Sequence, residues 1–273
     1  MAETERVAIV TGAAGGIGRV MTRALLAEGI RVAGVDRDRE PLETLAAIAR
    51  EQGKAAELLT IATDLTDDSA VDAITKATRG KFGRIDILIN NAGIGPGAIR
   101  PDSWQRPLKF WEITPDQWRR FVAVHTTAPL ALTNAVVPEM MRQGWGRIVN
   151  VTTSLGTMLN AGNPTYGPSK PALEALSAIM AKDLNGTGVT VNVLVPGGAT
   201  NTPMISGEAG FNRCRERHWS ALSRGSLGHQ PAAGTSGREG GSTRRVDQHS
   251  DDANHAKPLV GPFTRHIRLA RRS

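Results

Sequence analysis

Residues 7–18 read VAIVTGAAGGIG, a short β-branched run that leads into a glycine-rich turn. Residues 7–10 have the length and composition of a buried strand, and the segment from the turn to about Glu28 has the pattern of an amphipathic helix. A strand, a glycine-rich turn and a helix in this order suit a pyrophosphate group, because the backbone N–H groups at the start of the helix face the anion. The stretch therefore predicts a dinucleotide-binding turn.

The glycines of this turn have separate expected roles. Gly12 permits a tight turn, Gly16 lets the backbone approach a phosphate, and Gly18 lets the helix pack closely on the strand. Ile17 lies between the last two and belongs to the same predicted cofactor site. Glycine-rich turns also occur as ordinary loop punctuation, so the prediction depends on the strand before the turn and the helix after it.

Five further β-branched runs follow, at residues 31–35, 58–62, 85–90, 147–152 and 190–195. Longer amphipathic segments separate them. Parallel strands need crossover connections, and right-handed crossovers place helices on both faces of the sheet. Residues 1–204 therefore predict one α/β domain, with a Rossmann-type doubly wound parallel sheet and helices on both faces.

Asp36 follows the second run directly, about 20 residues after the glycine-rich turn. An acidic side chain at this place can accept hydrogen bonds from the hydroxyl groups of the adenosine ribose, and it would repel a 2′-phosphate. We therefore expect NAD in preference to NADP. Two alternatives stay open: Arg37 could turn toward a phosphate, or Asp36 could be a solvated turn residue.

Two more predicted strands end in residues suited to a ligand. Asp64 and Leu65 follow the third run, and Asn91, Ala92 and Gly93 follow the fourth. Ligands of open α/β sheets bind at the carboxyl ends of the strands. We therefore expect these residues to contact the cofactor, the last three as a small floor under the adenine or ribose. An ordinary Asn-Gly-type turn is the alternative there.

The reacting groups are expected beyond the fifth run. Tyr166, the only tyrosine of the chain, and Lys170 are four residues apart, which places them on one face of a helix. A cation near a phenol lowers the pKa of the phenol, so Tyr166 could exchange a proton near neutral pH. A hydroxyl of Thr153 or Ser154 would hold a carbonyl oxygen while a hydride moves between substrate and nicotinamide. The alternative is an ordinary Tyr-Lys pair on a helix surface.

The motifs occur together in one order: TGAAGGIG at 11–18, Asp36, Asp64, NNAG at 90–93, the Ser/Thr cluster at 152–154, YGPSK at 166–170, and Pro196-Gly197. In this respect residues 6 to about 204 resemble the short-chain dehydrogenase/reductase family. The resemblance implies a Rossmann fold, an NAD(P) cofactor and carbonyl/alcohol redox chemistry with Tyr166 as acid and base. It also implies that Lys170 binds the nicotinamide ribose, that Thr202 binds the carboxamide, and that Pro196 and Gly197 contact the cofactor.

The chain departs from the family pattern at three positions. The catalytic hydroxyl of the family lies about thirteen residues before the tyrosine, which lands on Thr153 with Ser154 one residue later, so both stay open. His125 replaces an asparagine that anchors a water relay to the lysine. Imidazole cannot copy the geometry of an amide, so the relay and the activity could be weakened. Pro171 should be tolerated if its helix begins near residues 166–168, because it then lies close to the first turn.

The connection over residues 95–113 is longer than the fold needs, and it carries Trp104, Phe110 and Trp111. It could form a wall on the substrate side of the site. Ordinary packing of the aromatic side chains is the alternative.

Residues 205–273 break the pattern. They are rich in Arg, Gly, Ser and His, and they hold 12 Lys and Arg against 6 Asp and Glu, so the first 204 residues are almost neutral. We predict an irregular or disordered tail that leaves a sheet edge exposed and favours aggregation. We hypothesise that a shifted reading frame produced it. A single-base repair of the gene that restores a strand pattern would support this, and an intact related tail elsewhere would contradict it.

Composition limits the remaining function classes. Cys214 is the single cysteine and can form no intramolecular disulfide, and we expect no metal site. The arginines of the tail are dispersed without regularly spaced aromatics, and the N-terminus has no apolar segment of membrane length. We therefore expect a cytoplasmic protein with a small carbonyl or alcohol substrate and without nucleic-acid or membrane partners. Helices at residues 115–144 and 166–186 could pair between subunits of a homo-oligomer.

The leading prediction is an NAD(H)-preferring dehydrogenase or reductase of alcohols and ketones. The rival prediction is a catalytically silent dinucleotide-binding protein, or an inactive remnant with an altered C-terminal part. Both keep the glycine-rich turn and Asp36, and they differ in whether Tyr166, Lys170 and a hydroxyl are arranged for turnover.

Overall fold

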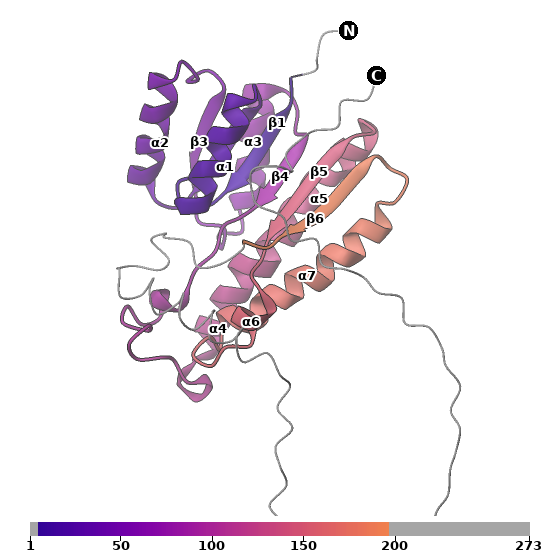
Figure 1. Cartoon of the computed structure of the whole chain (residues 1–273). Helices are drawn as coiled ribbons and strands as arrows, with labels where there is room; N and C mark the ends of the chain where they lie inside the picture. Colours follow the sequence, from indigo (N-terminus) through magenta and orange to yellow (C-terminus); the bar gives the residue numbers. More distant parts are fainter. Residues whose placement is uncertain (1–4, 197–273) are drawn as a thin grey trace, which may run out of the picture. The chain divides into compact units, whose positions relative to one another are not determined.

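Six parallel strands form one sheet in residues 5–196, the part of the chain that the computed structural model describes (Figure 1). Their order is β3-β2-β1-β4-β5-β6, and all five neighbouring pairs are parallel. This is the order of a Rossmann-type doubly wound sheet, so the predicted fold class is confirmed. The strands are β1 (Val7–Thr11), β2 (Arg31–Asp36), β3 (Leu58–Ala62), β4 (Ile87–Asn90), β5 (Gly146–Val151) and β6 (Val189–Leu194).

The strand order reverses at β1 and β4. Ala8 of β1 lies opposite Val32 of β2 on one side and opposite Ile87 of β4 on the other. From these two central strands the chain winds outward in opposite directions, and ligands of such sheets bind outside the carboxyl ends of these strands. The glycine-rich turn follows β1. The NNAG motif begins with the last residue of β4, so the fold brings the two predicted cofactor motifs to the same edge of the sheet.

Helices cover both faces of the sheet. Side chains of α3, α5 and α7, among them Ile74, Leu132 and Met180, form one core with one face. Side chains of α1 and α2, among them Leu26 and Leu45, form a second core with the other face. Figure 1 shows α1 and α2 toward the β3 end of the sheet and α7 beside β6. The helical elements are α1 (Gly16–Ala27), α2 (Arg39–Glu51), α3 (Ala70–Phe82), η1 (Pro96–Ala98), η2 (Phe110–Glu112), α4 (Pro115–Val122), the π-helical turn η3 (Ala123–Thr127), α5 (Ala128–Arg142), α6 (Leu155–Met158) and α7 (Tyr166–Asp183).

The elements α4, η3 and α5 form one continuous helical run, Pro115–Arg142. Its length and its mean hydropathy of 1.2 would allow it to cross a membrane. However, Leu132, Val136 and Met140 of this run are fully buried in the core against the sheet. Core packing therefore accounts for the apolar composition of the run.

Several predicted strand bounds need correction: the first two strands end one residue later than predicted, and the fifth and sixth begin and end one residue earlier. The fourth strand begins at Ile87 rather than at residue 85, although the backbone of Asp86 still bonds to Val7 (2.9 Å) and Arg147 (3.0 Å) of the neighbouring strands. Pro171 is the sixth residue of α7, beyond the four residues whose N–H groups lack helical partners. Pro171 therefore lies in the second turn rather than beside the first and leaves the carbonyl of Gly167 without its usual helical partner, yet α7 continues without a break to Asp183. The predicted tail at residues 205–273 lies outside the described residues.

Candidate active site

The glycine-rich turn leaves no room for side chains at its two ends. Gly12 has a φ of +63°, a left-handed conformation that favours glycine. A Cβ on Gly18 would stand 1.9 Å from the carbonyl oxygen of Gly12. Gly16 and Ile17 are the first two residues of α1, where backbone N–H groups lack helical partners. The turn is therefore a backbone cradle at the N-terminus of a helix, which fits a pyrophosphate group.

Asp36 is the last residue of β2 and lies against this turn. Its Oδ2 accepts a hydrogen bond from the backbone N–H of Ala14 at 3.1 Å, and the residue is half-buried. Arg37 pairs with Asp38 at 3.5 Å and is exposed. The Asp36 carboxylate therefore stabilises the glycine-rich turn and stands beside it, where the sequence placed the ribose contact. In this structure Arg37 binds its own neighbour.

The loop after β4 is tied to the same turn. The side-chain amide of Asn91 donates to the carbonyl oxygens of Thr11 (3.0 Å) and Gly12 (3.2 Å). The backbone N–H groups of Asn91 and Ala92 both donate to the hydroxyl of Thr11, at 3.0 and 3.1 Å. The Asn91 side chain thus holds the turn in place, and the Ala92 N–H is bound to Thr11 as well.

Asp64 and Leu65 both follow β3, but Asp64 binds a neighbouring residue of its loop whereas Leu65 packs against the core. Asp64 Oδ1 accepts hydrogen bonds from the N–H and the hydroxyl of Thr66, both at 2.9 Å. Burial raises the pKa of Asp64, but these two bonds and the nearby Arg120 and Arg37 outweigh it, and the pKa is lowered overall. The side chain of Leu65 packs against the core. Asp64 is therefore ionised and fixed at the rim of the sheet.

Tyr166 and Lys170 lie on one face of α7, as their spacing predicts. The Lys170 Nζ atom stands 5.7 Å from the centre of the Tyr166 ring. Lys170 is only 4% exposed, and its Nζ donates to the carbonyl oxygen of Val151 at the end of β5 (3.0 Å). Burial lowers the pKa of Lys170 to about 8. A buried cation beside the only tyrosine is not an ordinary surface pair.

The two candidate hydroxyls differ in what they bind. Ser154 is the N-cap of α6: its Oγ accepts from the N–H of Thr157 at 3.3 Å and lies 3.0 Å from the Thr157 hydroxyl. Thr153 is half-buried, and within residues 5–196 its hydroxyl has no hydrogen-bond partner. The preceding Thr152 donates to Glu174 at 2.7 Å. Thr153 is therefore the hydroxyl of this loop that stays available to a ligand.

His125, which stands where the family pattern has an asparagine, is held on both sides of its ring. It lies in the π-helical turn η3, is fully buried, and uses both ring nitrogens: Nε2 accepts from the N–H of Ile94 (3.0 Å), and Nδ1 lies 2.7 Å from the Ser169 hydroxyl. The ring also meets that of Tyr166 edge to face, with 5.4 Å between centroids. Burial, and secondarily the charge of Lys170, lower the pKa of His125 well below 6.5. The substitution is built into the packing around Tyr166.

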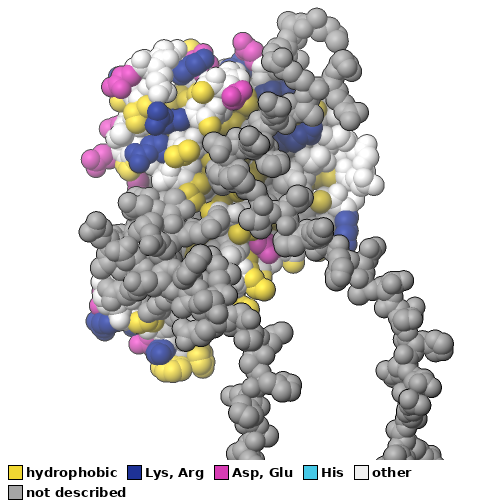
Figure 2. Space-filling view, viewed as in Figure 1, with side chains coloured by type: hydrophobic (Ala, Val, Ile, Leu, Met, Phe, Trp, Pro, Cys, Tyr) yellow, Lys and Arg dark blue, Asp and Glu magenta, His cyan; other side chains and the backbone are white. Residues whose placement is uncertain are grey.

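Aromatic side chains of the long connection before α4 are exposed. Phe110 and Trp111 are 74% and 71% exposed, which excludes core packing as the reason for these two residues, whereas Trp104 is half-buried. The connection reaches the loop that leads to Tyr166, since a Cβ on Gly162 would stand 2.8 Å from the Cβ of Pro107. Figure 2 shows the molecule from the same side as Figure 1. Hydrophobic side chains are visible at its lower end, where Figure 1 places the segment before α4. The connection thus presents apolar surface beside the candidate site.

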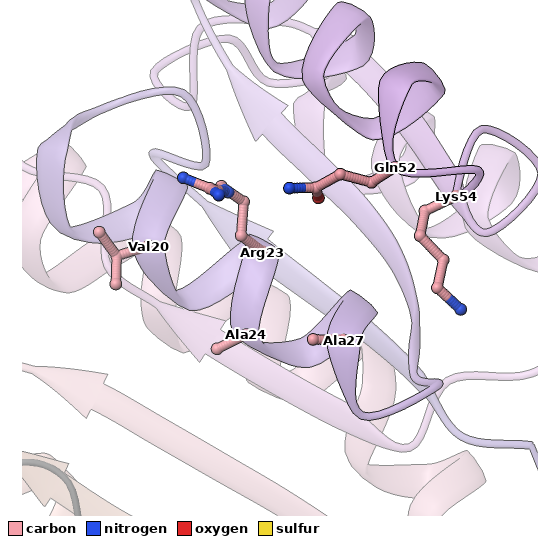
Figure 3. A pocket seen from close by; sticks show the side chains of 6 residues that line it. All are labelled: Val20, Arg23, Ala24, Ala27, Gln52 and Lys54. Atoms are coloured by element: carbon pink, nitrogen blue, oxygen red, sulfur yellow. The ribbon is translucent and has the colours of Figure 1, made fainter.

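A surface hollow of about 440 Å³ lies elsewhere, between α1 and the turn after α2 (Figure 3). None of the predicted site residues lines it, so we assign it no part in the site. The residues that line the hollow are Val20, Arg23, Ala24, Ala27, Gln52 and Lys54.

Three predicted cofactor contacts lie at or beyond the end of the described residues. Pro196 is the last described residue, and Gly197 and Thr202 lie outside the described range.

Comparison with known proteins gives consistent matches. A family model described as short chain dehydrogenase matches residues 6–209. The 3-oxoacyl-(acyl-carrier-protein) reductase of Salmonella typhimurium is 31% identical over 192 residues, which cover 70% of this chain and 72% of that protein. The corresponding reductase of Synechocystis sp. is 33% identical over 194 residues, which cover 71% and 74%.

Two solved structures resemble the described fold. A metagenomic short-chain oxidoreductase in complex with NADP has a TM-score of 0.62 and 33% identity, over 70% of this chain and 82% of that one. The 3-ketoacyl-(acyl-carrier-protein) reductase from Brucella melitensis, complexed with NADH, has a TM-score of 0.65 and 28% identity, over 74% and 79%.

Proposed function

Since this chain belongs to the short-chain dehydrogenase family and is an oxidoreductase of that family, we propose that it transfers a hydride between NAD(P) and a carbonyl or alcohol substrate, with Tyr166 as acid and base. The observation that carries the proposal is the buried Lys170 ammonium beside the Tyr166 ring, at the end of the sheet that holds the backbone cradle of Gly12 and Gly18. When bound, the nicotinamide supplies or accepts the hydride.

The residues of the chain carry the proton side of the reaction. In the direction of reduction, the Tyr166 hydroxyl donates its proton to the carbonyl oxygen as this becomes an alcohol. The Lys170 cation favours the ionised form of a neighbouring phenol and so stabilises the charge left on Tyr166. In the opposite direction Tyr166 takes the proton from the alcohol. Lys170, whose pKa is about 8, is largely charged at neutral pH.

We assign the carbonyl-holding hydroxyl to Thr153 rather than Ser154, because Ser154 caps α6 and the Thr153 hydroxyl has no partner in residues 5–196. Thr153→Ala should lower kcat about 10²-fold or more, since a hydrogen bond to the developing oxyanion is lost. Ser154→Ala should change kcat less than threefold and lower the free energy of unfolding by about 1 kcal/mol through the lost cap. Steady-state reduction of ethyl acetoacetate with NADH measures both, and the reverse ranking of the two variants would overturn the assignment.

We propose NAD(H) as the preferred cofactor. The family relatives include structures with NADP and with NADH, so the preference rests on Asp36 alone. NADH should bind about tenfold more tightly than NADPH, because the carboxylate repels a 2′-phosphate. Asp36→Asn should remove most of this ratio. Asp72→Asn, an equal charge change at an exposed residue of α3, should leave the ratio unchanged. Fluorescence titration measures the ratio, and equal affinity of the unaltered chain for both cofactors contradicts the assignment.

The exposed aromatics Phe110 and Trp111 favour a substrate with an apolar part. We also propose that the chain forms a homo-oligomer in which α4, α5 and α7 pair between subunits. Each of these helices carries an exposed apolar side chain: Trp118 (41% exposed), Met141 (46%) and Ile179 (55%). We place the activity in the cytoplasm.

A further inference from the structure

The ring of His125 lies where three separate segments meet. It comes from η3, the π-helical turn between α4 and α5, and π turns often occur at functional sites. On one side the ring contacts Ile94, which follows Gly93 in the loop after β4, and on the other it contacts Ser169, in the first turns of α7. His125 therefore connects the predicted cofactor floor to the helix that carries Tyr166.

The hydrogen bonds fix the protonation of the ring. A backbone N–H can only donate, so the Nε2 atom that receives the Ile94 N–H carries no proton. The single proton of a neutral imidazole then lies on Nδ1, which donates to the Ser169 hydroxyl. The Ser169 hydroxyl in turn donates to the backbone carbonyl of Tyr166 at 3.0 Å. Donors and acceptors match along the whole chain of bonds from Ile94 to Tyr166.

A second bond strengthens the same connection. The hydroxyl of Thr126 donates to the carbonyl oxygen of Ser169 at 3.1 Å, directly beside His125. The titratable groups that face the ring, Tyr166 and Lys170, both belong to α7, while α4 contributes the uncharged Phe121 ring at 5.6 Å. Proton gain by His125 would remove the acceptor for Ile94 and add a charge beside Lys170.

We propose that His125 is a positioning residue, which in its neutral form with the proton on Nδ1 fixes the loop after β4 relative to the first turns of α7 and thereby sets Tyr166 against the cofactor. Hydride and proton transfer need reacting groups held to within a fraction of an ångström. Loss of the two bonds should therefore lower kcat more than it raises KM for NADH.

The first test needs no enzyme activity. In ¹⁵N-labelled full-length protein, the imidazole of His125 should show protonated Nδ1 and unprotonated Nε2, and its shifts should stay constant down to about pH 6. The resonances are identified by their loss in His125→Phe or, should that variant fail to fold, by their shift in Ser169→Ala. The opposite tautomer, or a ring that is doubly protonated at neutral pH, overturns the proposal. The other five histidines all lie in residues 205–273.

The second test rests on the proposed oxidoreductase function. In NADH-dependent reduction of ethyl acetoacetate, His125→Phe should lower kcat about 10- to 100-fold with little change in KM for NADH. His125→Gln, whose amide keeps one acceptor and one donor, should recover most of kcat. Met140→Ala is the control. The Met140 side chain of α5 is buried in the core, so its removal opens a cavity there and should lower the free energy of unfolding by about 2–5 kcal/mol without changing kcat.

The outcomes of the two tests are distinguishable. Equal kcat for His125→Phe and the unaltered chain, or an equal loss of kcat in Met140→Ala, overturns the positioning role. An unaltered chain that binds NADH but reduces no carbonyl contradicts the proposed function, and the tautomer of His125 then decides the inference by itself.

Discussion

Tyr166→Phe should bind NADH as tightly as the unaltered chain and reduce ketones about 10²- to 10⁴-fold more slowly. The change removes one hydroxyl and keeps the ring, so the contacts of the ring with His125 and Lys170 persist. On the proposed function, the variant lacks the group that passes a proton to the carbonyl oxygen. Parallel measurement of kcat with ethyl acetoacetate and of NADH affinity by fluorescence separates the chemical step from binding.

The same variant separates the enzyme from a silent dinucleotide-binding protein. A binding protein also has the backbone cradle at Gly12 and Gly18, but it loses nothing when the Tyr166 hydroxyl is removed. Turnover that is equal in both proteins would show that another group supplies the proton. A parallel loss of NADH affinity would show that Tyr166 acts mainly in binding.

Asp86→Ala should lower the free energy of unfolding by about 3–4 kcal/mol. Asp86 is fully buried at the end of the sheet where β4 begins. Its carboxylate accepts hydrogen bonds from Arg84 (2.6 and 2.8 Å), from Arg6 (3.1 Å) and from the N–H of Val7 (3.0 Å). Alanine removes the carboxylate partner of both arginines and leaves one buried N–H without an acceptor, while Arg84 keeps its bond to Gln143 (3.1 Å). Because both arginines are partly exposed, water offsets part of the loss.

Urea unfolding followed by tryptophan fluorescence measures this loss. Asp102→Ala is the matched control. Asp102 forms a surface ion pair with Arg106, four residues later, at 3.3 Å, and such a pair should contribute less than about 1 kcal/mol to the free energy of unfolding. The folded Asp86→Ala protein should still bind NADH, since Asp86 precedes β4 and the predicted cofactor loop follows the other end of that strand. Equal stability of the two variants would contradict the structural role given to Asp86.

The fold was predictable because its signals are local. Each strand is a short β-branched run between turn residues, and the run in β1 is buried along its whole length, as expected for a parallel strand covered on both faces. The positions of Asp36, Asp64 and Asn91 at strand ends also follow from the chain alone. Asp36 and Asn91 both contact the glycine-rich turn because β2 and β4 are the two neighbours of β1, whereas Asp64 lies farther along the sheet edge, after β3.

The rest of the site depends on contacts between distant segments. In the sequence, Ser154 and Thr153 are equally good candidates for the catalytic hydroxyl. Only the structure shows that Ser154 caps the N-terminus of α6. The sequence shows His125 as a departure from a pattern, and the partners that explain it lie 31 and 44 residues away. The side chain of Asn91 also holds the glycine-rich turn, which no local pattern indicates.

The most direct test is a titration of the purified full-length chain with NADH and NADPH, followed by nicotinamide fluorescence, beside a Gly18→Ala variant. The structure predicts saturable binding with NADH about tenfold tighter than NADPH. It also predicts no binding by the variant, whose added Cβ meets the Gly12 carbonyl. Binding of neither cofactor by the folded, unaltered chain would contradict its assignment as a nicotinamide-dependent oxidoreductase.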